Sequence, residues 1–264
     1  MSSPRLWPKR RCLYRPENPL STARNDLSGA TIAFDLDGCL VDTAPDLIGT
    51  LNTILAQHGH HGLPLDAART VVGHGARAML TLGFQAVGET LSPEQMNHLF
   101  DRFIALYRAR IDMASRPYPG VVEVLAEFAA TGAKLVVCTN KRTDLSLALL
   151  DALHLTYRFV AVVGPDKAGA AKPDPHHLLF AIQAAGGSAD RALMIGDSSS
   201  DVGAAKAAGI PVVAVSFGYS DVPAADLGAD ALIDSFAELP PIARRLLAGR
   251  QAAIRPVLPD QADA

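Results

Sequence analysis

Two short aspartate-rich runs each follow an apolar segment, and their carboxylates could bind one metal ion together. Asp35 and Asp37 stand two residues apart, directly after the apolar residues 31–34. On an extended chain, residues two apart face the same side, so these carboxylates can point together. Asp197 and Asp201 stand four apart after a second apolar run, a spacing that shares one face of a helix. The sequence therefore offers two pairs of carboxylates that can converge.

A cation would offset the repulsion within this group. At about 4 Å and an effective dielectric constant near 20, each pair of like charges costs on the order of 4 kcal/mol. Oxygen ligands without Cys or His favour a hard divalent ion, and Mg²⁺ is usual where a phosphate completes the shell. Asp42 or Asp201 alone is more simply explained as a helix cap. Asp35, Asp37 and Asp197 each come just beyond an apolar run, so we predict a Mg²⁺ site.

Two further segments carry groups that suit a phosphate. Thr139 and Asn140 end the apolar run that starts at residue 134, and they offer a hydroxyl and a backbone N–H to phosphate oxygens. Lys172 precedes a Pro-Asp-Pro turn, in which two prolines fix the backbone and hold the ammonium group in position. These residue types indicate a bound phosphate ester beside the metal ion.

The elements that must position these groups are short apolar runs alternating with helical patterns. Runs without polar alternation are typical of strands covered on both faces, and hence of a parallel sheet flanked by helices. The predicted strands span residues 31–34, 134–139, 159–163, 192–195, 211–215 and 231–233, and the predicted helices span 121–130, 145–153, 177–184, 201–208 and 236–247. We predict a doubly wound α/β fold, in which ligands bind beyond the carboxyl ends of the strands.

A helical insert separates the first two predicted strands. About 95 residues lie between them, whereas a crossover needs only a dozen or so. Thr43 with Asp46 predicts a capping box, and Ser92 with Gln95 marks another helix start. The predicted parts are a tail over residues 1–28, a core domain over 29–43 and 117–248, a helical cap domain over 44–116, a C-terminal tail over 249–264, and hinges near 42–43 and 116–120.

Composition excludes several classes of protein. The 264 residues, 49% hydrophobic and 19% charged, suit a globular chain with one domain and an insert. A balance of 24 Lys and Arg against 27 Asp and Glu lacks the basic excess of a nucleic-acid-binding protein. Three cysteines without a CxxC pair favour a reducing, cytoplasmic setting. No apolar stretch approaches the 18 or so residues that a membrane-spanning helix needs, so we expect no membrane span. We expect a small molecule as the partner.

Four motifs stand in order along the chain. They are DLDGC at residues 35–39, Thr139-Asn140, Lys172-Pro173 and GDSSSD at residues 196–201. In order and context they resemble the haloacid-dehalogenase-like phosphohydrolase superfamily over roughly residues 31–247, and the insert is similar to that family's cap domain. The resemblance implies a Rossmann-like core and a Mg²⁺-dependent phosphatase.

The same resemblance implies a role for each matching residue. Asp35 would be the nucleophile that forms an aspartyl-phosphate, and Asp37 would protonate the leaving oxygen and later deprotonate water. Cys39 stands where the family most often has Thr, and we expect altered local hydrogen bonding without loss of activity. The residues implied to bind phosphate are Thr139, Asn140 and Lys172. The groups implied to bind Mg²⁺ are the carboxylates of Asp35 and Asp197 and the main-chain carbonyl of Asp37, with Asp201 in support.

Within the superfamily, residues 71–77, 118–121, 139–141 and 217–223 resemble the bacterial phosphoglycolate phosphatase family. This resemblance implies that 2-phosphoglycolate is hydrolysed to glycolate and phosphate. The cap contact for the substrate carboxylate would come from Gly73, His74, Gly75 and Arg77. In the alternative interpretation, the two glycines merely border helices and the arginine is solvated.

Two other functions stay open on the sequence. One is a phosphatase or phosphomutase for another small metabolite, such as a sugar phosphate or a nucleotide. The other is a phospho-accepting regulatory module that uses the same acids and Mg²⁺. Such a module needs no cap, so the residues 44–116 argue against it.

Overall fold

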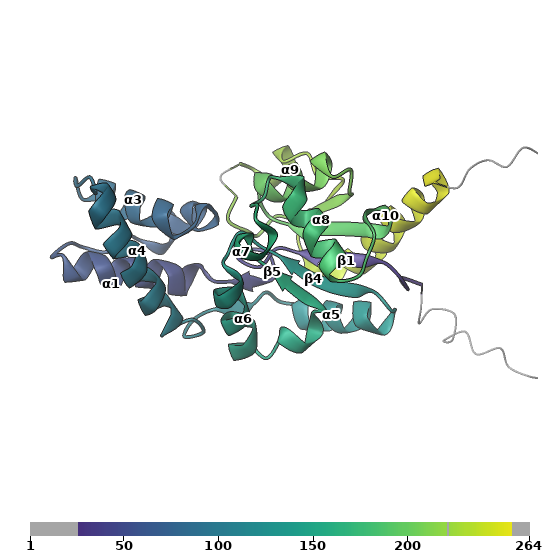
Figure 1. Ribbon diagram of the computed structural model, residues 1–264, viewed down its shortest axis with the longest axis horizontal. Helices are drawn as coiled ribbons and strands as arrows, with labels where there is room; N and C mark the ends of the chain where they lie inside the picture. Colours follow the sequence, from purple (N-terminus) through teal and green to yellow (C-terminus); the bar gives the residue numbers. More distant parts are fainter. Residues whose placement is uncertain (1–25, 221, 255–264) are drawn as a thin grey trace, which may run out of the picture.

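The computed structural model describes residues 26–220 and 222–254, and a parallel β-sheet lies at its centre (Figure 1). The strand order is β5-β4-β1-β6-β7-β8. The strands are β1 Thr31–Phe34, β4 Lys134–Cys138, β5 Ala161–Val163, β6 Ala192–Gly196, β7 Val212–Val215 and β8 Ala231–Ile233. Every neighbouring pair in this sheet is parallel, which confirms the predicted α/β class.

Helices cover both faces of the sheet. Ile32 and Phe34 of β1 belong to one hydrophobic cluster with residues of α5 (Val121–Ala130), α6 (Thr143–Ala152) and α10 (Leu239–Ile254). Ala33 between them belongs to a second cluster with residues of α8 (Pro175–Ala184) and α9 (Ser199–Ala207). Because alternate residues are buried on opposite faces, the strands read as continuous apolar runs. The doubly wound arrangement predicted from those runs is confirmed.

The register of β1 places three strand ends side by side. Phe34 pairs with Val137 of β4 on one side and with Ile195 of β6 on the other. Asp35 follows Phe34 directly, and the candidate residues of the two neighbouring strands follow two positions after their paired residues. The sheet therefore presents these side chains at one edge.

A separate group of helices lies beyond one end of the sheet (Figure 1). They are α1 Ala44–Gln57, α2 Leu65–Ala68, the 3-10 helix η2 Arg69–His74, α3 Ala76–Ala86 and α4 Pro93–Arg108. The chain enters the group through β2 (Val41–Asp42) and leaves through β3 (Arg116–Pro117), which pair antiparallel. All of these helices fall within residues 44–116, and the division into a core and a cap domain stays a prediction.

The start of α1 differs from the prediction. Thr43 and Asp46 form no capping box: Thr43 Oγ1 donates to Asp37 Oδ1 at 2.8 Å. Asp46 instead accepts hydrogen bonds from the backbone N–H and the hydroxyl of Ser115, at 2.8 and 2.7 Å. Both side chains have partners outside the helix, and these contacts replace the local cap. The predicted start of α4 is correct, because Ser92 and Gln95 form the reciprocal capping box.

Both ends of the folded region extend past their predicted limits. Leu27 is buried in the core, and Asp26 forms an ion pair with Arg244 at 2.5 Å. The chain therefore joins the core before residue 29. The helix α10 runs to Ile254, beyond the predicted end at 247 and into the predicted tail, because the intervening Arg, Gln and Ala residues are strong helix formers. Residues 1–25 and 255–264, the rest of the predicted tails, lie outside the described residues.

Short elements complete the described fold. They are α7 Pro165–Ala168 and the 3-10 helices η3 Thr156–Arg158, η4 Ala189–Arg191, η5 Ala224–Asp226 and η6 Phe236–Glu238. No helix in the described part of the chain has the length and apolar character needed to cross a membrane.

Candidate active site

Three of the predicted carboxylates meet at the edge of the sheet. Asp35, Asp197 and Asp201 each direct an oxygen to a common place, with these oxygens within 4.8 Å of one another. The carboxylate of Asp37 does not belong to this group. The strand β1 ends at Phe34 and the chain turns, so the alternation expected for an extended segment does not continue through Asp37. The predicted metal ligand of Asp37, its main-chain carbonyl, stays a prediction.

Lys172 lies beneath this group and ties two of the carboxylates together. Its Nζ lies 2.9 Å from Asp35 Oδ1 and 2.5 Å from Asp201 Oδ1, and it donates to the carbonyl of Cys138 at 2.8 Å. Burial alone would lower the pKa of Lys172, but the two carboxylates outweigh burial and raise its pKa. The buried ammonium group therefore stays charged beside Asp35.

The group carries more negative charge than its protein partners neutralise. Burial raises the pKa of Asp35 to about 6, although Lys172 opposes the shift. Burial, with the nearby charges of Asp35 and Asp201, also raises the pKa of Asp197. Apart from its ion pair with Lys172, the buried Oδ1 of Asp35 has no hydrogen-bond partner among the described residues. Hard oxygen donors in this state suit a divalent cation such as Mg²⁺.

A glycine keeps the space beside Asp197 open. Gly38 has a φ of +83°, and a Cβ on it would lie 2.5 Å from Asp197 Oδ2 and 2.8 Å from Tyr219 Cδ2. Any side chain here would be strained by the positive φ and would displace the carboxylate. The glycine of the DLDGC motif is therefore explained by close approach of two segments.

Asp201 supports the loop that holds Asp197. Its Oδ2 accepts hydrogen bonds from the Asp197 and Ser198 backbone N–H groups, at 3.2 and 3.1 Å, and from the Ser198 hydroxyl at 2.7 Å. Ser198 and Asp201 also form the capping box of α9. The side chain is fully buried, so this residue caps the helix and joins the carboxylate group at the same time.

The candidate phosphate-binding residues occupy the neighbouring strand end. Asn140 exchanges two hydrogen bonds with the Lys172 backbone, at 3.0 and 2.9 Å, which joins the two loops. Thr139 Oγ1 accepts from the Lys141 N–H at 3.1 Å. No described residue accepts a hydrogen bond from the backbone N–H of Asn140. The backbone donor predicted to hold a phosphate oxygen is thus available to a ligand.

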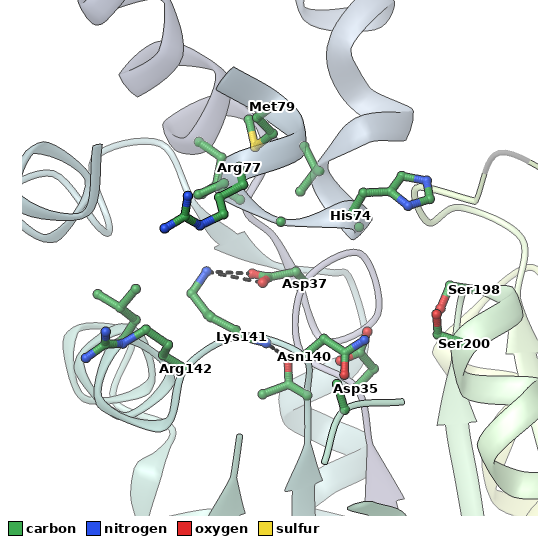
Figure 2. A pocket seen from close by; sticks show the side chains of 18 of the residues that line it. Asp35, Asp37, His74, Arg77, Met79, Asn140, Lys141, Arg142, Ser198 and Ser200 are labelled. Atoms are coloured by element: carbon green, nitrogen blue, oxygen red, sulfur yellow. Dashed lines mark hydrogen bonds and ion pairs between the residues drawn. The ribbon is translucent and has the colours of Figure 1, made fainter. Parts of the chain in front are cut away.

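Sequence reasoning gave no role to two residues next to Asp37. Lys141 Nζ lies 3.0 and 3.2 Å from the two Asp37 carboxylate oxygens (Figure 2). It also donates to the hydroxyl of Tyr107 at 2.8 Å. Asp37 and Tyr107 outweigh burial and raise the pKa of Lys141. The position of Lys141 directly after Thr139-Asn140 could have indicated a role in the site. Tyr107 gave no such indication, because the sequence pattern placed it only on an apolar helix face.

Tyr219 is a third residue that sequence reasoning left without a role. Its backbone N–H donates to Asp197 Oδ2 at 2.6 Å. Its hydroxyl donates to Asp42 Oδ1 at 2.5 Å and accepts from the backbone N–H groups of Thr43 and Ala44, at 2.7 and 2.9 Å. Through its backbone N–H and its hydroxyl, this one residue therefore connects the carboxylate group with the entry to the helical group.

A cavity of about 530 Å³ lies between the sheet edge and the helical group. Asp35, Asp37, Thr139, Asn140, Lys172 and Asp197 line it from the core, and Gly73, His74, Gly75 and Arg77 line it from the opposite side. Figure 2 shows Arg77 and Met79 above Asp37 and Lys141, with Asp35 below them. The residues that the sequence singled out in two distant segments therefore share one cavity.

The fold and the site are those of an α/β protein with a candidate metal centre at the carboxyl ends of its strands. Residues 32–215 match the family model described as haloacid dehalogenase-like hydrolase. The chain belongs to this family, and the resemblance drawn from its four motifs is confirmed.

Individual relatives span most of the chain. A phosphoglycolate phosphatase of Caulobacter vibrioides is 57% identical, covering 82% of this chain and 91% of that protein. An N-acetylmuramic acid 6-phosphate phosphatase of Pseudomonas aeruginosa is 35% identical, covering 82% and 95%. The crystal structure of a predicted phosphoglycolate phosphatase from Haemophilus somnus has a TM-score of 0.76 and 28% identity, covering 82% and 98%.

Proposed function

We propose that this chain is a Mg²⁺-dependent phosphatase that hydrolyses 2-phosphoglycolate to glycolate and phosphate. The strongest support for a phosphatase is the convergence of Asp35, Asp197 and Asp201 above Lys172 in a cavity with room for a small ester. The substrate is supported by relatives named phosphoglycolate phosphatase, of which three are 44% to 57% identical to this chain.

Asp35 is the nucleophile in this proposal. Its carboxylate attacks phosphorus, the bond from phosphorus to the ester oxygen breaks, and an aspartyl-phosphate forms. Asp37 gives its proton to the departing glycolate oxygen. Water then attacks the same phosphorus, Asp37 takes the proton of that water, and phosphate leaves with Asp35 restored. Lys172, 2.9 Å from Asp35 Oδ1, keeps the nucleophile ionised.

The remaining groups hold the phosphoryl oxygens and the cation. The Thr139 hydroxyl, the Asn140 N–H and the Lys172 ammonium bind the oxygens as negative charge shifts between them. The carboxylates of Asp35 and Asp197 and the main-chain carbonyl of Asp37 would hold the metal ion. Asp201 fixes the loop that carries Asp197. When bound, Mg²⁺ supplies positive charge that offsets the repulsion between the carboxylates and the phosphate.

The helical residues 44–116 act as a cap domain over this site. The turn of Gly73, His74, Gly75 and Arg77 lines the cavity opposite the core, and it helps to select the substrate. Closure about β2 and β3 excludes water during phosphoryl transfer, and opening releases the products. A cytoplasmic location fits the buried free thiols of Cys39 and Cys138.

A second substrate has specific support. The match to the relative named N-acetylmuramic acid 6-phosphate phosphatase covers 95% of that protein. This ester is therefore an alternative to 2-phosphoglycolate at the same site. A regulatory module has no comparable support in the relatives.

The test is a substrate panel with the purified full chain, in Mg²⁺ and in chelator. The panel contains 2-phosphoglycolate, N-acetylmuramic acid 6-phosphate, a hexose 6-phosphate and a nucleoside monophosphate. We expect many turnovers per chain, the highest kcat/KM on 2-phosphoglycolate, and no release of phosphate in chelator. A higher kcat/KM on another ester would overturn the substrate, and one phosphate per chain would overturn the enzyme.

A further inference from the structure

Lys141 and Tyr107 meet in the cavity although they come from opposite sides of it. Lys141 follows the end of β4 in the core, and Tyr107 lies near the end of α4 in the helical group. The Lys141 ammonium donates to the Tyr107 hydroxyl at 2.8 Å and lies 4.5 Å from the centre of its ring. Both side chains line the cavity, and only 6% of the Lys141 side chain is exposed. Two polar tips are thus held together without bulk solvent.

The Tyr107 hydroxyl still has a proton to donate. It accepts from Lys141, and no described residue accepts a hydrogen bond from it. Tyr107 is fully buried, and burial raises its pKa to about 12, so the phenol keeps its proton. A buried donor without an acceptor is costly. An acceptor brought by a ligand would satisfy it.

The other arginine and lysine side chains that line the cavity are committed elsewhere. Lys172 is bound to Asp35 and Asp201. Arg77 donates to Asn97 at 2.9 Å and lies over the Phe100 ring at 4.5 Å. Arg142 pairs with an exposed acid, and 55% of its side chain is exposed. Among these four side chains, Lys141 is the one that is buried and in direct contact with Asp37.

The position of Asp37 fixes where the rest of a substrate must lie. A carboxyl group that protonates the ester oxygen lies about 3 Å from that oxygen. Lys141 Nζ lies 3.0 and 3.2 Å from the Asp37 oxygens. In 2-phosphoglycolate a single CH₂ joins the ester oxygen to the carboxylate, so the carboxylate lies within about one hydrogen-bond length of that oxygen. The carboxylate is therefore within reach of the Lys141 ammonium group.

We propose that Lys141 and Tyr107 together form the subsite for the substrate carboxylate, with the ammonium and the phenol each donating to one of its oxygens. This inference rests on the proposed function and assigns the recognition of the acid group within it. It places that recognition on a core lysine and a helical tyrosine rather than on the turn of residues 73–77. Because the subsite needs both sides of the cavity, it is complete only when the cap lies over the core.

The experiment measures the carboxylate preference, defined as kcat/KM for 2-phosphoglycolate divided by kcat/KM for ethyl phosphate, which lacks the acid group. We expect Lys141→Met to lower this ratio roughly 10- to 100-fold, as loss of a charge-assisted hydrogen bond implies. Tyr107→Phe keeps the ring and the packing, and we expect a fall of about 3- to 10-fold. Lys167→Met and Tyr157→Phe, at exposed positions outside the cavity, are matched controls that keep the ratio.

A role limited to holding Asp37 would lower both kcat/KM values equally and leave the ratio unchanged, which would overturn the subsite. A loss of preference in Arg77→Gln, with the ratio intact in Lys141→Met and Tyr107→Phe, would overturn it in favour of the turn. In both cases the wild-type preference for 2-phosphoglycolate would stand, and so would the proposed function. A wild-type enzyme with no carboxylate preference would overturn both.

Discussion

The two walls of the cavity are built differently. On the core wall, Lys172 and Asp201 are buried and each has several close partners. On the facing wall, a Cβ on Gly73 or Gly75 would meet no atom within 4 Å, and the Arg77 contact with Asn97 is exposed. Apart from Lys141, the core wall fixes groups for chemistry common to all phosphate esters, and the other wall can vary without disturbing it. Substitutions on the two walls should therefore fail in different ways.

The largest effect is expected at the proposed nucleophile. Asp35→Asn keeps the size of the side chain but removes the attacking carboxylate, so kcat should fall at least about 10⁴-fold on every ester. Steady-state phosphate release measures it. Asp174→Asn, at the N-cap of α8, is a matched control that should keep full activity, because Asn caps a helix as well as Asp does. Substantial activity in Asp35→Asn would break the assignment of chemistry to the core wall.

Removing the buried lysine should cost both stability and activity. Lys172→Met leaves Asp35 and Asp201 without their shared cation, and breaking a buried ion pair from one side costs about 3–5 kcal/mol. Urea unfolding in chelator gives the free energy of unfolding. Lys134→Met removes an exposed lysine bonded to the Gly186 carbonyl and should cost less than about 1 kcal/mol. Equal losses in the two variants would contradict the contrast between buried and exposed positions.

The metal-free core wall should lose stability as the pH rises from about 4 to about 6. The pKa of Asp35 is raised from 3.8 to about 6 on folding, so the folded chain binds this proton more tightly than the unfolded chain. The stabilising contribution is complete below the unfolded pKa and is lost as the pH passes the folded pKa. The pKa of Asp197 is also raised on folding.

Asp35→Asn removes this titration and supplies the comparison. In chelator, the free energy of unfolding of the wild type should fall relative to that of Asp35→Asn by on the order of 2–3 kcal/mol between pH 4 and pH 6. Mg²⁺ binding should weaken below about pH 6, because protons compete for the same carboxylate. If the difference in free energy of unfolding between the two proteins stayed constant across this range, burial would not raise the pKa of Asp35.

The smallest effect is expected on the facing wall. Gly75 has a φ of +85°, whereas Gly73 does not have a positive φ, and both have open space for a methyl group. Gly75→Ala should destabilise the chain by about 1–2 kcal/mol through backbone strain and raise KM a few-fold with kcat little changed. Gly73→Ala should be close to neutral. Similar kcat losses in these variants and in core variants would erase the difference between the walls.

The sequence predicts the core wall well because its signals are local. Asp35, Thr139 and Asp197 each directly follow an apolar strand, and parallel topology brings strand ends together without further information. Helix starts were less accurate: α8 begins at Pro175, two residues before the predicted start, because Asp174 caps it through the His176 N–H. Apolar periodicity does not register such a cap.

The contacts between the walls could not be predicted in the same way. Lys141 and Tyr107 lie 34 positions apart, and Tyr219 reaches Asp42 across 177 positions. Neither pair has a spacing that signals contact. The predicted capping box of Thr43 and Asp46 was wrong because residues outside the helix bind both side chains, Asp37 binding the first and the distant Ser115 the second. Partner choice across the cavity depends on the tertiary fold.

A rapid acid quench identifies the residue that receives the phosphoryl group. The full chain with Mg²⁺ is mixed with 2-phosphoglycolate labelled in its phosphate, stopped within a single turnover, digested and mapped by mass spectrometry. We expect the label on Asp35, with none on Asp37 and none in the Asp35→Asn variant. Label on a different side chain, or phosphate released in that first turnover from protein that never carries label, would contradict a mechanism through Asp35.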